Sequence, residues 1–343
     1  MSKDPENRNG ERPAGEPYDR REIDRRDFLI RTAKVGVALA ATGGAGYFLY
    51  DPAGPTASSE KSSTALPDFS VPEAGRKIAI VTGDDRAKSL AAGLKALGGI
   101  ETFIRKGDRV LVKVNAAFAS PPALCATTNP ELVSELVRLC LKAGAASVAV
   151  TDNPINHPDS CFALSGIGEA ARTAGASLIL PADSLFSNLT VPGTRFIRDW
   201  PVFLGPFRGV TKLIGVAPVK DHHRSGASMS MKNWYGLMGG RRNIFHQDIH
   251  TFIKDLAIMV KPTLVVLDGT FTMISNGPTG GSMSDLKKTG TMILSTDQVA
   301  ADAAGAVLLG KNPADLPYIG KAAIAGAGTA DFESLGPFRV AAG

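Results

Sequence analysis

A stretch rich in chemically active side chains runs from residue 220 to residue 250. It reads KDHHRSGASMSMKNWYGLMGGRRNIFHQDIH and holds four of the five histidines of the chain. Residues 195–261 carry 11 basic and 4 acidic side chains, a net charge of +7, whereas the whole chain of 343 residues has a net charge of +5. This local excess predicts a binding site for a small anion. Nucleic acid is not an expected partner, because basic runs interleaved with aromatic residues are absent.

The segment SMSMKNWYGLMGG supplies groups that suit an oxyanion. Ser228, Lys232 and Asn233 bring hydroxyl, ammonium and amide groups close to glycines, whose backbone N–H groups can approach a ligand. The spacing matches neither a P-loop nor a dinucleotide fingerprint. We predict that these three residues bind the anion and that Lys232 takes part in catalysis. The simpler alternative is an exposed amphipathic helix with Met229, Met231 and Leu237 in the core.

Several apolar segments that should form strands end in a polar residue. These residues are Asn115, Asp152, Lys220, Asp268 and Asp297. In parallel sheets ligands bind beyond the carboxyl ends of the strands, so we expect the five to form one polar rim. We assign ligand binding to Asn115, Lys220 and Asp268, although each could simply cap a helix or form a turn.

Lys113 lies inside the apolar strand segment RVLVKVN. Side chains alternate along a strand, so Lys113 should point to the opposite face from Val112 and Val114. A lysine within a buried strand is costly unless it is paired or faces a ligand. We therefore include Lys113 among the ligand-binding residues, with a solvent-reaching lysine at the strand end as the alternative.

The histidines predict two further roles. His222 and His223 are adjacent, and neighbours on an extended chain point in opposite directions, so we expect only one, His223, to act as an acid or base. His246 and His250 are four residues apart and would share one face of a helix that begins early enough. With a third ligand such as Asp268 they could hold a divalent transition metal. Polar surface residues are the alternative in both cases.

Apolar β-branched segments alternate with helical patterns along the chain. Strands are predicted at 77–83, 109–115, 147–152, 177–182, 211–220, 263–269 and 291–297, and helices at 85–100, 129–145, 246–260, 298–309 and 313–325. This alternation predicts an α/β fold with a mostly parallel sheet and helices on both faces. The three cysteines form no C-x-x-C pair, so no iron–sulfur motif is expected.

Residues 1–50 have the features of an export signal. Arg25 and Arg26 are followed by Phe28 and by a modestly apolar run up to Tyr50. This resembles a twin-arginine (Tat) signal, which implies the Tat translocase as a partner and a periplasmic or other extracytoplasmic location. The apolar run could also remain as a membrane tether.

The rest of the chain divides by composition. Residues 51–75 are rich in Pro, Ser and Ala and predict a linker. Residues 76–330 carry the alternating strands and helices of the α/β domain. Residues 331–343 are left as a C-terminal tail.

Seven segments resemble one known family in their order and spacing. They are VLVKVN, TTNPELVSELVRLCLKAGAASVAVTD, GVAPVKDHH with SMSMKNWYGLM, KPTLVVLDG with NGPTGG, and STDQVAADAAGAVLLG. The family is the one catalogued as domain of unknown function 362, and the resemblance extends from about residue 78 to about residue 326. Some relatives carry a ferredoxin-like four-cysteine module that this sequence does not contain. The resemblance implies no settled activity.

These features predict an exported enzyme or cofactor-handling protein that acts on a small anionic ligand, with or without a metal. A non-catalytic periplasmic protein that binds an anion or a metal complex is a second candidate. An accessory factor that docks on a redox partner is a third.

The export signal gives the first testable prediction. Changing Arg25 and Arg26 together to Lys should retain the folded protein in the cytoplasm, because the translocase recognises the arginine pair. Cell fractionation with immunoblotting measures this. The pair Arg20 and Arg21, five residues upstream, provides the matched control: its change to Lys should leave export intact. Undiminished export of the first variant would exclude a Tat signal.

Overall fold

A computed structural model of the protein describes residue 26, residue 30 and residues 65–343. The described residues 65–343 all belong to one compact unit. Arg25 and the apolar run after it lie outside the described residues, as do residues 51–64 of the predicted linker. Within the described part of the chain, no helix is long and apolar enough to cross a membrane.

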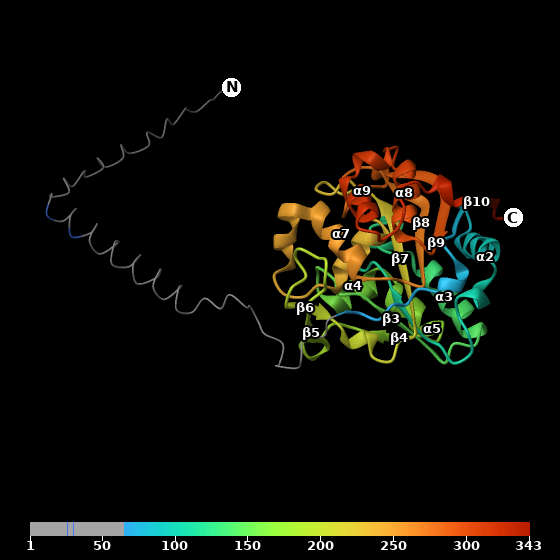
Figure 1. The fold of residues 1–343 in the computed structure, drawn as a ribbon, viewed down its shortest axis with the longest axis horizontal. Coiled ribbons are helices and arrows are strands. Elements are labelled where there is room, and N and C mark those ends of the chain that lie inside the picture. The colour runs from blue at the N-terminus through green and yellow to red at the C-terminus, as the bar shows by residue number, and fades with distance from the viewer. Residues whose placement is uncertain (1–25, 27–29, 31–64) are drawn as a thin grey trace, which may run out of the picture. The chain divides into compact units, whose positions relative to one another are not determined.

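One eight-stranded sheet forms the centre of the described unit (Figure 1). Its strand order is β10-β1-β9-β8-β7-β2-β3-β4. The strands are β1 (Ile78–Thr82), β2 (Arg109–Lys113), β3 (Ser147–Thr151), β4 (Ser177–Ile179), β7 (Lys212–Lys220), β8 (Leu264–Met273), β9 (Leu286–Ser295) and β10 (Phe338–Ala341). Every pairing is parallel except the two made by β9, which runs against both β1 and β8. The prediction of a mostly parallel sheet is confirmed.

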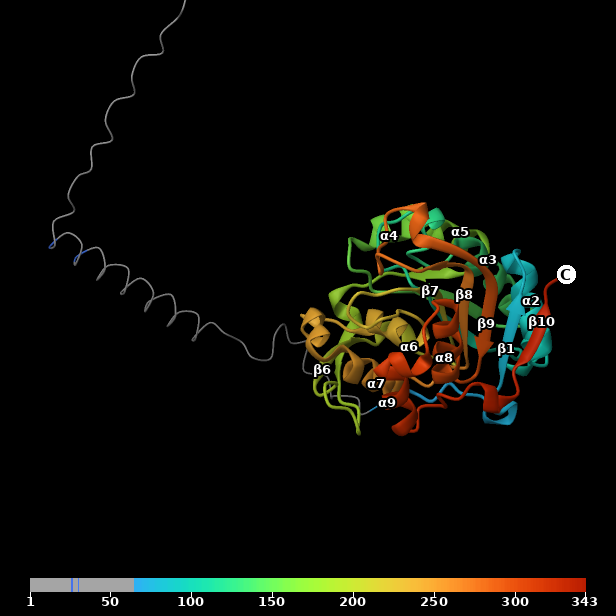
Figure 2. The same ribbon diagram turned by 90° about the horizontal axis from the view of Figure 1, so that it is seen from above.

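Helices cover both faces of this sheet, as Figure 2 shows from above. One face carries α2 (Arg86–Ala96), α3 (Pro130–Lys142) and α5 (Ile167–Thr173), and the other carries α6 (Ser230–Asn233), α7 (Ile249–Met259), α8 (Gln298–Leu308) and α9 (Pro317–Ile324). The helix α4 (Pro158–Leu164) precedes α5. Local chemistry sets the helix starts: the Asn129 side chain accepts from the Glu131 N–H, and Pro130 occupies the first turn of α3.

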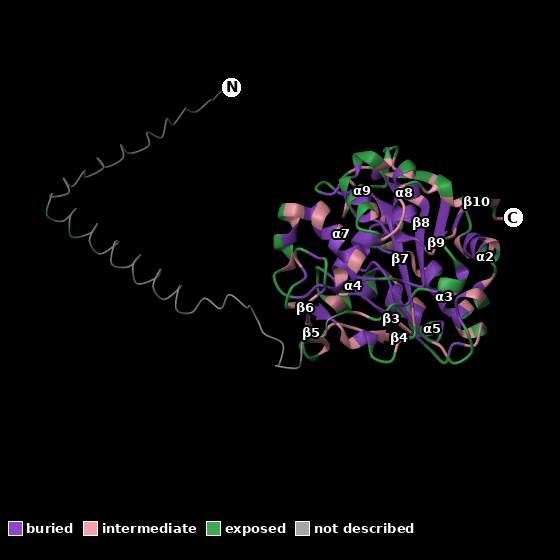
Figure 3. Ribbon diagram, viewed as in Figure 1, coloured by how far each residue is buried: buried purple, intermediate pink, exposed green. Residues whose placement is uncertain are grey.

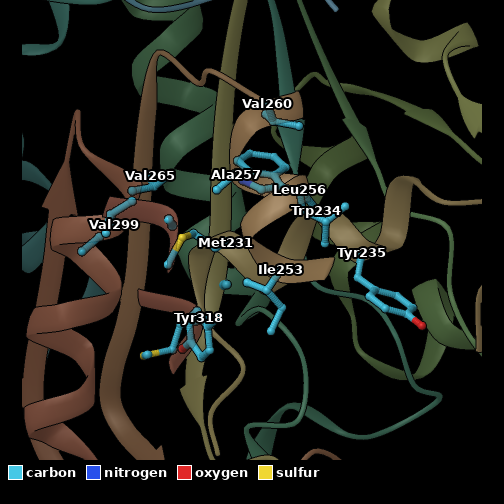
Figure 4. Close-up of a cluster of buried hydrophobic side chains, with 14 of the residues drawn as sticks. Met231, Trp234, Tyr235, Ile253, Leu256, Ala257, Val260, Val265, Val299 and Tyr318 are labelled. Carbon is cyan, nitrogen blue, oxygen red and sulfur yellow. The ribbon is translucent and has the colours of Figure 1, made fainter. Parts of the chain in front are cut away.

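Two hydrophobic cores lie on the two faces of the sheet. The central strands are buried on both sides, which explains their nearly continuous apolar sequences (Figure 3). The core beneath α6–α9 contains Met231 and Trp234 of the SMSMKNWYGLM segment (Figure 4). The alternative interpretation of this segment, an amphipathic helix with buried methionines, is confirmed in part. Met229 and Met231 are buried, but the helix α6 has only four residues.

The structure adds elements that local patterns did not reveal. A separate two-stranded sheet forms from β5 (Phe186–Leu189) and β6 (Trp200–Phe203). The strand β10 lies within the predicted C-terminal tail and extends the large sheet beside β1. The predicted helix 246–260 begins as an α-helix only at Ile249, because residues Arg242–Asp248 form a 3-10 helix.

The polar rim does not include Asp297. This residue follows β9, and because β9 is antiparallel its carboxyl end lies at the opposite edge of the sheet from the ends of β2, β3 and β7. Asp297 instead caps α8, where its side chain accepts from the N–H groups of Val299 and Ala300. Strand direction is set by long-range topology, so the local sequence could not have predicted this.

A glycine in β7 gives a test of this packing. A Cβ on Gly215 would lie 2.6 Å from the Trp234 ring, so Gly215→Ala should lower the free energy of unfolding by about 1–3 kcal/mol. A Cβ on Gly320 in α9 would meet no other atom within 4 Å, so Gly320→Ala should instead add about 0.5–1 kcal/mol. Urea denaturation measures both. Equal effects of the two changes would contradict this arrangement of Trp234 against the sheet.

Candidate functional site

A pocket of about 1080 Å³ opens at the carboxyl edge of the sheet. Its floor comes from residues that end or follow β2, β3 and β7. Its walls come from α6, from residues 240–247, most of which belong to the 3-10 helix Arg242–Asp248, and from the loop around residues 276–279. The predicted residues that line it are Asn115, Lys220, His223, Ser228, Lys232, Asn233 and His246. The pocket therefore lies on the side of the sheet that α6 covers.

Lys113 supports this pocket from beneath. It is fully buried, and its Nζ lies 2.8 Å from Asp152 Oδ1 and donates to the backbone carbonyls of Val114 and Asn233, at 2.7 and 2.8 Å. Val112 and Val114 belong to the core on the other face, so the predicted direction of Lys113 is confirmed. Because all of these contacts are internal, Lys113 positions the site and does not itself line the cavity.

Asn233 ties the same group together. Its Oδ1 accepts from Lys113 Nζ at 3.1 Å and from Asn115 Nδ2 at 3.3 Å, and its Nδ2 donates to the Lys113 and Val216 carbonyls. One side chain thus joins α6 to β2 and β7. This fixes the orientation of the neighbouring Lys232.

Gly236 is needed for this arrangement. A Cβ at this position would lie 2.1 Å from Asp152 Oδ1 and 2.9 Å from Lys113 Nζ. A side chain would therefore push the buried ion pair apart, at a cost typical of breaking such a pair. The glycine allows close packing of the backbone against the pair.

Lys220 ends β7 and is 1% exposed. Its Nζ donates to the Ala126 carbonyl at 2.5 Å and to Asn115 Oδ1 at 3.3 Å, and no carboxylate pairs with it in the described part of the chain. Burial, with the nearby ammonium of Lys232, lowers the pKa of Lys220 to about 7. The side chain is thus held as a donor at the floor of the pocket.

Lys232 differs from Lys220 because its Nζ has no hydrogen-bond or carboxylate partner among residues 65–343. Lys232 is 9% exposed, and its Nζ lies 4.8 Å from the centre of the Tyr235 ring. Burial, together with the charge of Arg242, lowers the pKa of Lys232 to about 7. The free donor faces the cavity.

Arginines increase the positive charge of the pocket. Arg242 donates to the carbonyls of Asn153, Met238 and Pro154, which fixes its guanidinium in the wall. Arg224 and Arg241 also line the cavity, and among the described residues Asp152 is the one acidic group in the lining. Since Asp152 is already paired with Lys113, the positive charge of the lining is uncompensated.

Three imidazole rings stack along one wall. His222 lies between His223 and His246, with ring centroids 5.0 and 5.9 Å apart and interplanar angles of 8° and 11°. The expectation that only one of His222 and His223 reaches the site does not hold. The two residues lie at the start of a turn that the backbone bridge between Lys220 and Ser228 closes, and both rings line the cavity.

Hydrogen bonds set the proton positions on these rings. His222 Nδ1 accepts from the Arg224 and Ser225 N–H groups, which leaves its Nε2 as the protonated nitrogen, and burial holds its pKa far below the usual value. His246 Nδ1 lies 3.2 Å from the Asn243 carbonyl and 3.1 Å from Tyr235 Oη, so Nδ1 is the donor and Nε2 is free to accept a proton. Burial also lowers the pKa of His246.

Tyr235 connects this wall to the hydrophobic core. Its ring packs in the core, while its hydroxyl points away from the cluster, as Figure 4 shows, and donates to the Arg242 carbonyl at 2.5 Å. Burial raises the pKa of Tyr235, so the phenol stays protonated at neutral pH.

Two predicted site residues lie elsewhere. Asp268 does not line the pocket, and its Oδ2 accepts from Arg86 Nε of α2 at 2.7 Å, on the opposite face of the sheet. His250 lies in α7 and stacks on Tyr318, with centroids 6.2 Å apart, whereas His246 stacks on His222. In the described residues no group of three or more His, Cys, Asp or Glu side chains could hold a metal ion.

Sequence reasoning missed several residues of the site. His222, Tyr235 and Arg242 line the pocket but are not among the predicted residues, although all three lie within residues 220–250. Asp152 was noted at a strand end, but its pairing with Lys113 joins residues from different strands and has no local signature. The doubled arginines after Gly239 and Gly240 were the one available signal for Arg242.

Two known proteins show partial similarity to this chain. A thylakoid-associated protein of Synechocystis sp. is 27% identical over 247 residues, which are 67% of this chain and 71% of that protein. A crystal structure of a protein from Thermotoga maritima aligns with 12% identity and a TM-score of 0.34 over 54% of this chain and 51% of its own, and this similarity is too low to carry an argument. The model of the family described as domain of unknown function (DUF362) matches residues 110–307, which span β2 to α8 and the whole pocket floor. The chain therefore belongs to the DUF362 family.

Proposed function

We propose that this protein binds a small anionic ligand in the basic pocket and acts on it as an enzyme. One observation carries the proposal: Lys220 and Lys232 are both buried in the lining of this pocket, and neither has a carboxylate partner in the described part of the chain. Burying an ammonium without compensation is costly. A protein retains such a pair most readily where a bound anion supplies the missing negative charge.

The donors around the two lysines suit the oxygen atoms of a phosphate or carboxylate group. Arg242 is held rigidly by three carbonyls, and the protonated Nε2 of His222 lines the same cavity. Fixed donors in a poorly solvated site bind an oxyanion without reorganisation.

Catalysis is supported by the proton acceptors beside these donors. His246 Nε2 is free to accept a proton, and His223 Nδ1 lies 3.4 Å from the Gly277 carbonyl, so its Nε2 is also free. An acid or base with a pKa near neutrality transfers protons efficiently, and Lys232 meets this condition. We assign catalytic roles to Lys232 and His223, with a binding protein as the outcome if no turnover exists.

The location of this activity rests on Arg25 and Arg26. We propose that the protein acts outside the cytoplasm after Tat export, on the basis of that arginine pair alone.

Removing the Lys232 ammonium should weaken anion binding. Lys232→Met is expected to raise the Kd for inorganic phosphate or sulfate about ten- to a hundredfold, since a charge-assisted contact contributes about 1.5–3 kcal/mol. Isothermal titration calorimetry measures the affinity. In the ligand-free protein the same change should leave the thermal midpoint unchanged or higher, because it removes an uncompensated buried charge.

Lys212 offers a matched control for this experiment. It begins the strand that Lys220 ends, outside the pocket, so Lys212→Met removes an equal charge without touching the site. Its Kd for sulfate should stay within about twofold of wild type. An equal loss of affinity in both variants would show that net charge, and not the pocket, binds the anion.

The affinity should also depend on pH. The pKa values of Lys220 and Lys232 are lowered to about 7 in the free protein, and a bound anion favours the protonated lysines. Binding therefore takes up protons above pH 7, and the Kd for sulfate should rise as pH increases, by up to about tenfold per pH unit for each lysine. Sulfate keeps its charge over this range, so a Kd that stays constant between about pH 6 and pH 9 would contradict the assignment.

A further inference from the structure

The Lys232 side chain has a feature that anion binding alone does not require. Its Nζ makes no hydrogen bond within residues 65–343, although the side chain lines the pocket and its Nζ lies over the Tyr235 ring. Lys113 next to it makes three hydrogen bonds and an ion pair, and Lys220 makes two hydrogen bonds. Of these three buried lysines, only Lys232 can present its nitrogen lone pair to a ligand without breaking an existing contact.

The surroundings of Lys232 favour the neutral amine. Desolvation and the Arg242 guanidinium both disfavour the ammonium, and the Tyr235 ring covers one side of Nζ. Besides Arg242, the charged and titratable groups that line the cavity are Lys220 at the end of β7, Arg224, Arg241, the three stacked imidazoles, and Asp152, which Lys113 neutralises. An unpaired, buried lysine beside other cations is an arrangement that activates an amine nucleophile.

We propose that Lys232 is a nucleophile that forms a Schiff base with a carbonyl-bearing anion, such as a 2-oxo acid or an aldehyde that carries a phosphate group. The inference rests on the proposed function, because the cations of the same pocket hold the negative group of the substrate. Lys220 and Arg242 would bind the anionic end while Nζ of Lys232 meets the carbonyl carbon.

The reaction balances without an oxidant or any other reagent. The lone pair of Nζ forms a bond to the carbonyl carbon, the π electrons of the carbonyl move to its oxygen, and one proton passes from nitrogen to that oxygen. The C–O bond then breaks and the C=N bond forms, while the second proton of the amine leaves with the oxygen as water. His223 and His246 line the same cavity with a free Nε2 each, and such groups can carry these protons.

Reductive trapping tests this proposal on the full-length protein. Wild-type protein is incubated at about pH 7 with pyruvate, glyoxylate or pyridoxal 5′-phosphate and sodium cyanoborohydride, and the adduct is located by peptide mass spectrometry. We expect one dominant adduct on Lys232, formed at least about tenfold faster than on any surface lysine, because an ordinary lysine with a pKa near 10.4 is almost wholly protonated at this pH. Excess sulfate should slow the labelling by occupying the anion site.

Two variants separate nucleophilic chemistry from charge. Lys232→Arg keeps a cation but removes the amine, so it should retain sulfate binding within about tenfold and lose the dominant adduct. Lys212→Met should be labelled at Lys232 as fast as wild type. Mapping of the wild-type adduct stays decisive even if Lys232→Arg fails to fold.

Each outcome decides the question. A dominant adduct on Lys232 that sulfate suppresses supports the Schiff base. Labelling that falls on Lys220, or equally on the surface lysines, overturns it. If none of the three carbonyl compounds gives an adduct while sulfate still binds, the Schiff base is excluded and the proposed anion site stands. If neither sulfate binding nor an adduct is found, both proposals fail.

Discussion

The buried ion pair between Lys113 and Asp152 is the interaction on which the rest of the site depends. It joins the ends of β2 and β3, and through Asn233 it fixes α6 above the same edge of the sheet. Removing one partner of such a pair leaves an unpaired buried charge, which typically costs about 3–5 kcal/mol. The backbone at Gly236 packs directly against this ion pair, and a side chain at that position would collide with both partners. Lys232 directly precedes Asn233 in α6. The contacts between Lys113 and Asn233 therefore also fix the position of Lys232.

The short helix α6 is also held from its other side. Asp302 of α8 accepts from the N–H groups of Ser230 and Met231, and the Trp234 indole donates to Gln298 Oε1 at 2.7 Å. A four-residue helix has little stability of its own, so these contacts with α8 must supply its order. Burial raises the pKa of Asp302 to about 7, yet the N–H groups it accepts from favour its charged form. The helix is thus held directly by Asp302, and by the Lys113–Asp152 pair through the contacts of Lys113 with Asn233.

The sequence predicted those parts of this arrangement that local patterns encode. Strand alternation placed Lys113 on the face opposite Val112 and Val114, and the basic stretch identified the segment that carries Lys220 and Lys232. What it could not predict depends on contacts between distant segments. The pairing of Lys113 with Asp152 joins two strands, and the reversed direction of β9 moves Asp297 to the far edge. Asp268 likewise faces Arg86 because its strand position points to the other layer of helices.

The same contacts explain why three neighbouring lysines can differ in chemistry. Lys113 has a carboxylate and carbonyls, Lys220 has a carbonyl and an amide oxygen, and Lys232 has only an aromatic ring among the described residues. All three are buried, so desolvation disfavours the ammonium form in each, and the number of internal acceptors decides how much of that cost is offset. The number of internal acceptors falls from Lys113 beneath the pocket, to Lys220 at its floor, to Lys232 in its wall. The nitrogen of Lys232 therefore has no hydrogen-bond partner among the described residues. This difference lets the fold keep Lys113 as a structural cation while Lys232, which lines the pocket above it, remains available to a ligand.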